Sequence, residues 1–234
     1  MNGFKEGKYK MDKVRFKERE MPDYTRGEEI FNMVSHIVGA AFGIAALVLT
    51  VVFSAIYNDM WAVVSSAIYG TTMVLLYTVS SVYHGLNMNM GKRVMQVIDH
   101  CTIYLLIAGT YTPVALCPIR EYSPLCGWVL FGVVWGCALL GIIFTAIDMD
   151  KFSRLSMVFY LGMGWCIIMA AKPALASVPL PGLLWILLGG VAYTVGAGMF
   201  VIGKTRRYMH SVFHVFVVLG SVLQFFGILL YVVL

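Results

Sequence analysis

Two pairs of polar residues have the types and spacing of a metal site. His210 and His214 stand four residues apart in RRYMHSVFH, and Ser80 and His84 have the same separation in SSVYH. In a helix this separation places two side chains one turn apart on the same face. Both imidazoles of the first pair can therefore reach a single ion, and the second pair offers a third imidazole.

An acidic residue, Asp99, lies between these motifs in IDHC, next to His100. Neighbouring residues are about 100° apart around a helix, so only one of the two is expected to face a given point. Three imidazoles that leave a fourth position open to water form a catalytic zinc site, in which a carboxylate orients the water or accepts its proton. The absence of thiolates argues against an iron–sulfur cluster, and the absence of a carboxylate cage argues against calcium or magnesium.

The composition indicates the elements that position these residues. Of the 234 residues, 60% are hydrophobic and 12% are charged, which leaves too few polar groups to cover a water-soluble globule. Runs such as residues 44–53 are apolar on every side, as in a lipid-facing or buried helix and unlike a barrel strand. The sequence therefore predicts an all-α integral membrane protein with seven transmembrane helices, each supplying the roughly 20 residues that a span needs. The expected spans are residues 33–57, 61–84, 94–117, 124–147, 153–171, 181–203 and 208–234.

The basic residues predict the orientation of the spans. Of the 17 lysines and arginines, all but Arg120 and Lys172 fall in the N-terminal tail or in loops on the same side. The positive-inside rule then places the N-terminus in the cytoplasm and the C-terminus outside. We divide the chain into a cytoplasmic polar tail, residues 1–28, and one seven-helix transmembrane domain, residues 29–234. All five histidines then lie near cytoplasmic helix ends, at one depth, as a site between helices requires.

Each motif, taken alone, also has a simpler explanation. The histidine pair next to Arg206 could face lipid headgroups at the membrane interface. Asp99 could pair with Arg93 or cap its helix, and Ser80 could hydrogen-bond its own backbone. None of these alternatives predicts that histidines and a carboxylate from three spans converge at one depth.

Pairs of glycines four residues apart predict close approaches between helices. Gly39 with Gly43 and Gly132 with Gly136 have this spacing. We expect both pairs to serve packing, because small residues let neighbouring backbones come together in membranes.

The five cysteines show no CxxC pair and no metal-ligand spacing. They are expected to fill small apolar spaces. Cys117 and Cys126 flank the same expected outer loop, so a disulfide between them is left open.

The motif SSVYH at the end of the second span, DH at the start of the third and HSVFH at the start of the seventh resemble those of a known family. It is the hemolysin III branch of the progestin and adipoQ receptor family, and EEIFNMVSHIVG at the first span is also similar to its bacterial members. The resemblance implies that Asp99 acts catalytically through a metal-bound water, with support from Ser80. It also implies three direct zinc ligands, His84, His210 and His214.

The same resemblance leaves His36 and His100 in structural or peripheral roles. Eukaryotic relatives resemble ceramidases, which implies a zinc-dependent hydrolase that cleaves an amide or ester in a membrane lipid. Zinc would lower the pKa of its water from ~15.7 towards ~7, with Asp99 as the general base. The alternative is a non-enzymatic protein of membrane homeostasis or sensing with structural zinc, or a haemolysin-type cytolysin. We expect a multi-pass protein of the plasma membrane with a lipid substrate or ligand and no nucleic-acid partner; the oligomeric state is left open.

Overall fold

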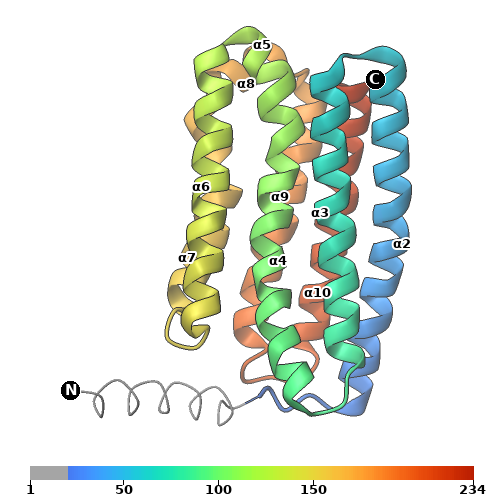
Figure 1. The fold of residues 1–234 in the computed structure, drawn as a ribbon, viewed down its shortest axis with the longest axis vertical. Helices are drawn as coiled ribbons and strands as arrows, with labels where there is room; N and C mark the ends of the chain where they lie inside the picture. The colour runs from blue at the N-terminus through green and yellow to red at the C-terminus, as the bar shows by residue number, and fades with distance from the viewer. Residues whose placement is uncertain (1–20) are drawn as a thin grey trace, which may run out of the picture.

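This computed structural model describes residues 21–234 of the chain, which contain seven helical spans joined by short loops (Figure 1). Most of the predicted tail, residues 1–28, lies outside these described residues. No strand occurs between residues 21 and 234, so the prediction of an all-α protein with seven spans is confirmed there. The spans are α2 (Arg26–Tyr57); α3 (Met60–Gly85); α4 (Met90–Val114) continued by η1 (Ala115–Ile119) and α5 (Arg120–Tyr122); α6 (Pro124–Asp148); α7 (Ser153–Gly164) continued by η2 (Cys166–Ala170) and α8 (Ala171–Ser177); α9 (Leu180–Ile202); and α10 (Met209–Ile228) continued by η3 (Leu229–Val233).

The first span begins at Arg26, seven residues before the expected start. A capping box fixes this end: the Thr25 hydroxyl accepts from the Glu28 backbone N–H at 3.2 Å, and the Glu28 carboxylate accepts from the Thr25 backbone N–H at 2.8 Å. The early start places two polar turns inside α2. As a result Glu29 belongs to the helix and faces its neighbours, as does His36, which the expected span already contained.

The spans pack as a ring. α3 packs between α2 and α4, α6 joins α4 to α7, and α10 contacts both α9 and α2. Contacts between α7 and α9 close the ring, and α4 is the most enclosed of the spans. The start of α2 and the C-terminus lie at opposite ends of the molecule (Figure 1).

The fifth span is broken halfway, where the sequence predicted a continuous helix over residues 153–171. α7 ends at Gly164, and the Tyr111 hydroxyl of α4 donates to the Gly164 carbonyl at 2.8 Å and accepts from the Ile167 N–H at 3.0 Å. The Trp165 indole donates to the Thr194 hydroxyl of α9 at 3.2 Å. A break in a membrane helix is tolerated where neighbouring groups satisfy the freed backbone, as Tyr111 does here.

One of the two predicted glycine contacts is correct. A side chain at Gly39 would meet the Tyr77 ring at 2.6 Å and one at Gly43 would meet Met73 at 3.3 Å, so α2 and α3 approach closely there. The expectation for Gly132 and Gly136 is wrong within residues 21–234, because a side chain added at either site would meet no neighbouring helix within 4 Å. The buried stripe of α6 runs along a different face of that helix, through Leu130, Val134, Ala138 and Gly141.

All five cysteines have free thiols. Cys117 is buried in η1, and Cys126 packs against the apolar core from α6. The disulfide left open by the sequence is therefore not formed.

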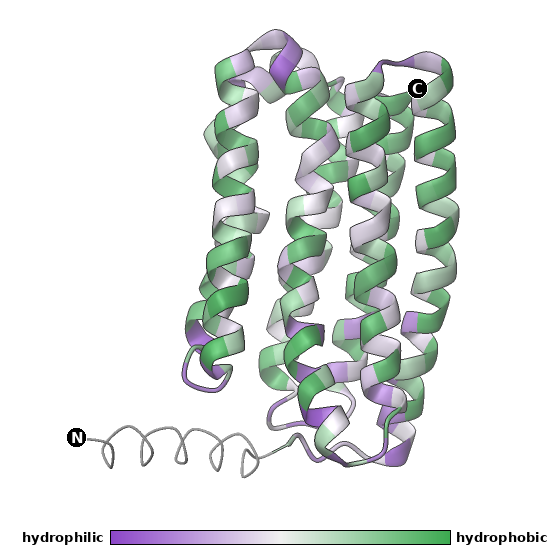
Figure 2. Cartoon of the chain, in the orientation of Figure 1, coloured by the Kyte–Doolittle hydropathy of each residue, from purple (hydrophilic) through white to green (hydrophobic). Residues whose placement is uncertain are grey.

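The distribution of hydropathy fits a membrane-embedded bundle. Hydrophobic residues run along the lengths of the helices, and hydrophilic residues gather at the two ends, most of all where α2 begins (Figure 2). Large apolar side chains point outwards along the spans, among them Leu125, Ile147 and Val158, which are 75%, 69% and 65% exposed. Such a surface suits lipid as the surrounding solvent.

Candidate metal centre

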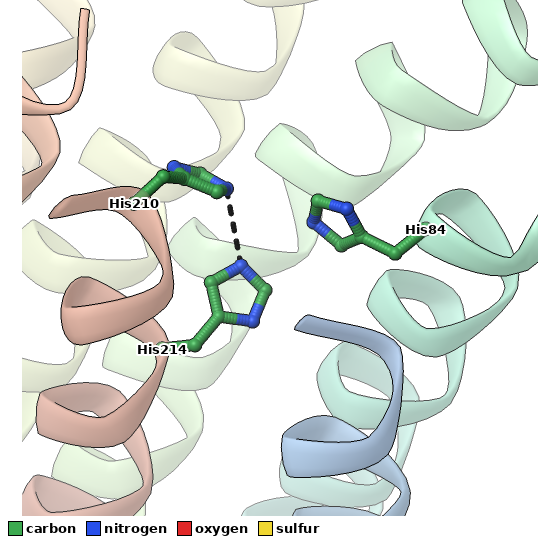
Figure 3. A group of neighbouring side chains, drawn as sticks. All are labelled: His84, His210 and His214. Atoms are coloured by element: carbon green, nitrogen blue, oxygen red, sulfur yellow. Dashed lines mark hydrogen bonds between the residues drawn. The ribbon is translucent and has the colours of Figure 1, made fainter. Parts of the chain in front are cut away.

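Three imidazoles meet inside the bundle, at the end where α2 begins. One ring nitrogen from each of His84, His210 and His214 lies within 4.8 Å of the other two (Figure 3). His84 comes from the last turn of α3, and the other two occupy successive turns at the start of α10. All three side chains are buried. The structure thus brings together the three histidines that the spacing singled out.

The geometry of these rings suits a bound cation. His210 Nε2 and His214 Nε2 face each other at 3.1 Å (Figure 3). Two imidazole nitrogens bound to one tetrahedral zinc at 2.0–2.1 Å would lie about 3.3 Å apart, close to this separation. His84 Nε2 is buried and has no hydrogen-bond partner among the described residues. This cluster could therefore hold a metal ion, and imidazole nitrogens suit several transition metals besides zinc.

Asp99 and Ser80 form a pair beside the histidines. Ser80 of α3 lies beside the Asp99 carboxylate of α4, and both residues line the cavity that His210 and His214 border. Asp99 contributes no atom to the group of three converging nitrogens. Its neighbour His100 also borders the cavity, but the His100 Nδ1 bonds the Gln96 carbonyl at 2.8 Å. Of the two adjacent residues, Asp99 is the one that lies beside Ser80, in the SSVYH motif of α3.

Two charged residues at the centre were missed from the sequence. The Glu29 carboxylate contacts His84 Nδ1 at 2.6 Å, and the Lys92 ammonium contacts the other carboxylate oxygen at 2.7 Å. For Glu29 the sequence did hold a signal, the acidic pair Glu28 and Glu29 in EEIFN, but the family resemblance gives this pair no role. The first span expected from the apolar run began at residue 33, so Glu28 and Glu29 lay outside the expected helix.

His36 also lies closer to the centre than the sequence suggested. Its ring stacks on that of His214, with centroids 3.8 Å apart, and meets the Tyr77 ring edge-on at 5.0 Å. The side chain is buried, and neither ring nitrogen has a hydrogen-bond partner within residues 21–234. Of the structural or peripheral roles expected for His36, this packing directly against a histidine of the cluster fits the structural one.

The segment before α2 covers the cluster from the end of the bundle. The Tyr24 ring stacks on His210 with centroids 4.8 Å apart and planes 21° apart, and it lies 5.9 Å from the His84 ring. Burial, together with the nearby Glu29 charge, raises the pKa of the Tyr24 phenol. The phenol is therefore neutral at physiological pH, and an uncharged aromatic ring separates the histidines from the surface on this side.

A cavity of about 880 Å³ extends from the cluster into the bundle. Its volume lies within the range of sites that bind small molecules, roughly 300–1,000 Å³. His210, His214 and Asp99 border the polar end, and Tyr111 and Trp165 border the deeper part at the break in the fifth span. Apolar side chains form much of the remaining wall, among them Leu76, Ile103, Leu106, Ile107, Leu161 and Val217.

The fold and the cluster define a seven-span membrane protein with a buried three-histidine centre at one end of an internal cavity. The sequence profile of haemolysin-III-related proteins matches residues 24–225, and the chain belongs to this family. The hemolysin-3 homolog of Bacillus subtilis (strain 168) is 40% identical over 210 residues, which cover 90% of this chain and 97% of that protein. Hemolysin-3 of Bacillus cereus is 38% identical over 205 residues, 88% of this chain and 92% of that protein. The human monocyte to macrophage differentiation factor is 26% identical over 195 residues, 79% of this chain and 77% of that protein.

Proposed function

We propose that this protein is a zinc-dependent hydrolase that cleaves an amide or ester bond in a membrane lipid. The observation that carries the proposal is the cluster of three buried imidazoles, of which His210 and His214 border the polar end of a cavity with apolar walls, together with Asp99. A lipid has the matching shape, because its reacting bond joins a polar part to an acyl chain. The three histidines would hold the zinc, which supplies Lewis acidity towards a carbonyl and a water of lowered pKa.

The remaining roles belong to residues that border the same cavity. Asp99 would accept the proton of the attacking water and return it to the leaving group. The Ser80 hydroxyl, by donating to the Asp99 carboxylate, would fix the direction in which that carboxylate points. The apolar walls of the cavity would hold the acyl chain and exclude bulk water from the reacting bond.

A structural zinc is the second candidate, and the burial of the centre favours it. The three histidines join α3 to α10, and Tyr24 covers them, as suits an ion that only clamps helices together. In this alternative the cavity would bind a lipid without cleaving it, as in a membrane sensor.

Turnover of lipids by the purified chain separates the two functions. We expect the zinc-loaded protein in lipid nanodiscs to release fatty acid from an amide or ester lipid, to stop after chelation and to recover when zinc returns. The measurement is mass spectrometry of a total lipid extract before and after incubation. If the zinc-loaded chain consumes no lipid from such an extract, the hydrolase is excluded and the structural zinc remains.

The orientation is also part of this proposal: a plasma-membrane location with the N-terminus in the cytoplasm. Within residues 21–234, eight lysines and arginines lie at the end where α2 begins, and only Arg120 and Lys172 lie at the other. We therefore expect a periplasmic-type phosphatase fused after Leu234 to be active and a fluorescent reporter there to be dark. The opposite pair of signals would place the histidines at the outer end of the bundle.

A further inference from the structure

The Nδ1 atom of His84 meets a charged partner from another helix. The Glu29 carboxylate of α2 binds this atom at 2.6 Å through Oε2. In His214, by contrast, Nδ1 has no charged or other side-chain hydrogen-bond partner among the described residues, and Nε2 faces His210. α2 supplies none of the three histidines, yet it reaches one of them through this carboxylate.

We propose that Glu29 is a positioning residue of the metal centre, which holds His84 with Nε2 directed at the metal. A carboxylate accepts hydrogen bonds only, so the His84 Nδ1 must carry the proton, and the lone pair is left on Nε2. That Nε2 is buried and has no other protein partner in the described part of the chain. Carboxylates that bind the second nitrogen of a metal-ligating imidazole fix its tautomer and orientation and raise its basicity. This inference rests on the metal binding of the proposed function and not on hydrolysis.

Lys92 makes this use of Glu29 energetically acceptable. The Glu29 side chain is only 19% exposed, and a carboxylate in such a place is costly without a counter-charge. The Lys92 ammonium donates to Glu29 Oε1 at 2.7 Å and to the Leu86 carbonyl at 2.9 Å. Leu86 caps the C-terminus of α3, two residues after His84. The three charged or polar groups thus join α2, α3 and α4 around one imidazole.

The neighbouring acid provides a matched control. Glu28 lies in the same turn of α2 and also borders the cavity, but its carboxylate accepts from the Thr25 and Tyr208 backbone N–H groups, at 2.8 and 2.6 Å, and not from a histidine. It anchors the start of α2 to the start of α10. A change at Glu28 therefore loosens this helix end without touching an imidazole of the cluster.

The test measures metal affinity in the full chain, purified in detergent and stripped with a chelator. Zinc is titrated against a chromogenic competitor, and cobalt is titrated by its absorption spectrum, which reports the ligand geometry. We expect Glu29→Ala to weaken zinc binding by about 10- to 100-fold and to alter the cobalt spectrum. Glu29→Gln should fall between wild type and Glu29→Ala, because an amide oxygen still accepts the Nδ1 hydrogen bond but lacks the charge.

Glu28→Gln is expected to lower the melting temperature while the metal affinity and the cobalt spectrum stay at the wild-type values. The inference would be overturned if Glu29→Gln bound zinc with the wild-type affinity, or if Glu28→Gln lost as much zinc affinity as the Glu29 variants. The comparison of Glu29→Gln with the wild type is sufficient if Glu29→Ala does not fold. A wild type that binds no metal overturns this inference and the metal site together. A wild type that binds metal but cleaves no lipid removes only the hydrolase, and the role of Glu29 then stands on the affinities.

Discussion

Replacing His214 by alanine is expected to reduce bound zinc from about one ion per chain to nearly none. His214 Nε2 lies 3.1 Å from His210 Nε2, so its loss removes one of two nitrogens that face a common point. The loss should exceed the ~10- to 100-fold weakening that follows when only a partner of a ligand is removed. His36 stacks on His214, but its nitrogens are not among those that converge on the site, so it should not substitute. Elemental analysis of the purified chain measures the effect, and His210→Ala should behave in the same way.

His100→Ala is the control for this result. His100 lies at the same end of the bundle, but its Nδ1 bonds the Gln96 carbonyl within α4. The His100→Ala variant should therefore retain one zinc per chain. Full zinc content in both His210→Ala and His214→Ala would remove the three-histidine site.

Replacing Asp99 by asparagine is expected to preserve most of the metal and the fold while activity falls by ~10²- to 10⁴-fold, the usual cost of losing a general base. The carboxylate lies outside the set of three converging nitrogens, so the direct bonds to the metal remain. Asparagine has nearly the same size as aspartate and can accept a hydrogen bond from the neighbouring Ser80 hydroxyl, which limits the structural change. Zinc content, melting temperature and lipid turnover are measured on the same preparation.

A structural zinc predicts a different pattern for Asp99→Asn. Metal affinity would fall by about 10- to 100-fold and the melting temperature would fall with it, with no reaction to lose. Asp148→Asn is the matched control, because that carboxylate ends α6 and accepts from the Lys151 backbone N–H, away from the histidines. If Asp99→Asn loses zinc and stability together and the wild type cleaves no lipid, the hydrolase must be given up.

The sequence predicted the parts of this protein that depend on local pattern. Apolar runs are sufficient to identify spans, because a bilayer selects for length and hydrophobicity alone. The spacing of His210 and His214 places them on one face of any helix, so their proximity also needed no tertiary information. The convergence with His84 required only that alternate helix ends share one side of the membrane.

What the sequence did not predict depends on contacts between helices. The break in the fifth span is held by Tyr111, which lies more than 50 residues earlier in the chain. Glu29 lies within a helix only because α2 begins early, and the contacts of Glu29 and His36 depend on how α2 packs beside α3 and α10. Gly132 and Gly136 have the spacing of a packing contact, but the prediction of a contact failed because spacing does not reveal which face of α6 points inwards.

The position of Tyr24 over the centre has a consequence for biosynthesis. The chain enters the membrane from its N-terminus, so Tyr24 is made first and His210, on which it stacks, is among the last parts to be made. A chain that is still being translated carries one of the three imidazoles until α10 has inserted. A metal held by all three imidazoles can therefore bind only to a completed bundle. Tyr24, although it is made earlier, can stack on His210 only at that stage. Metal occupancy would then mark chains whose insertion is finished.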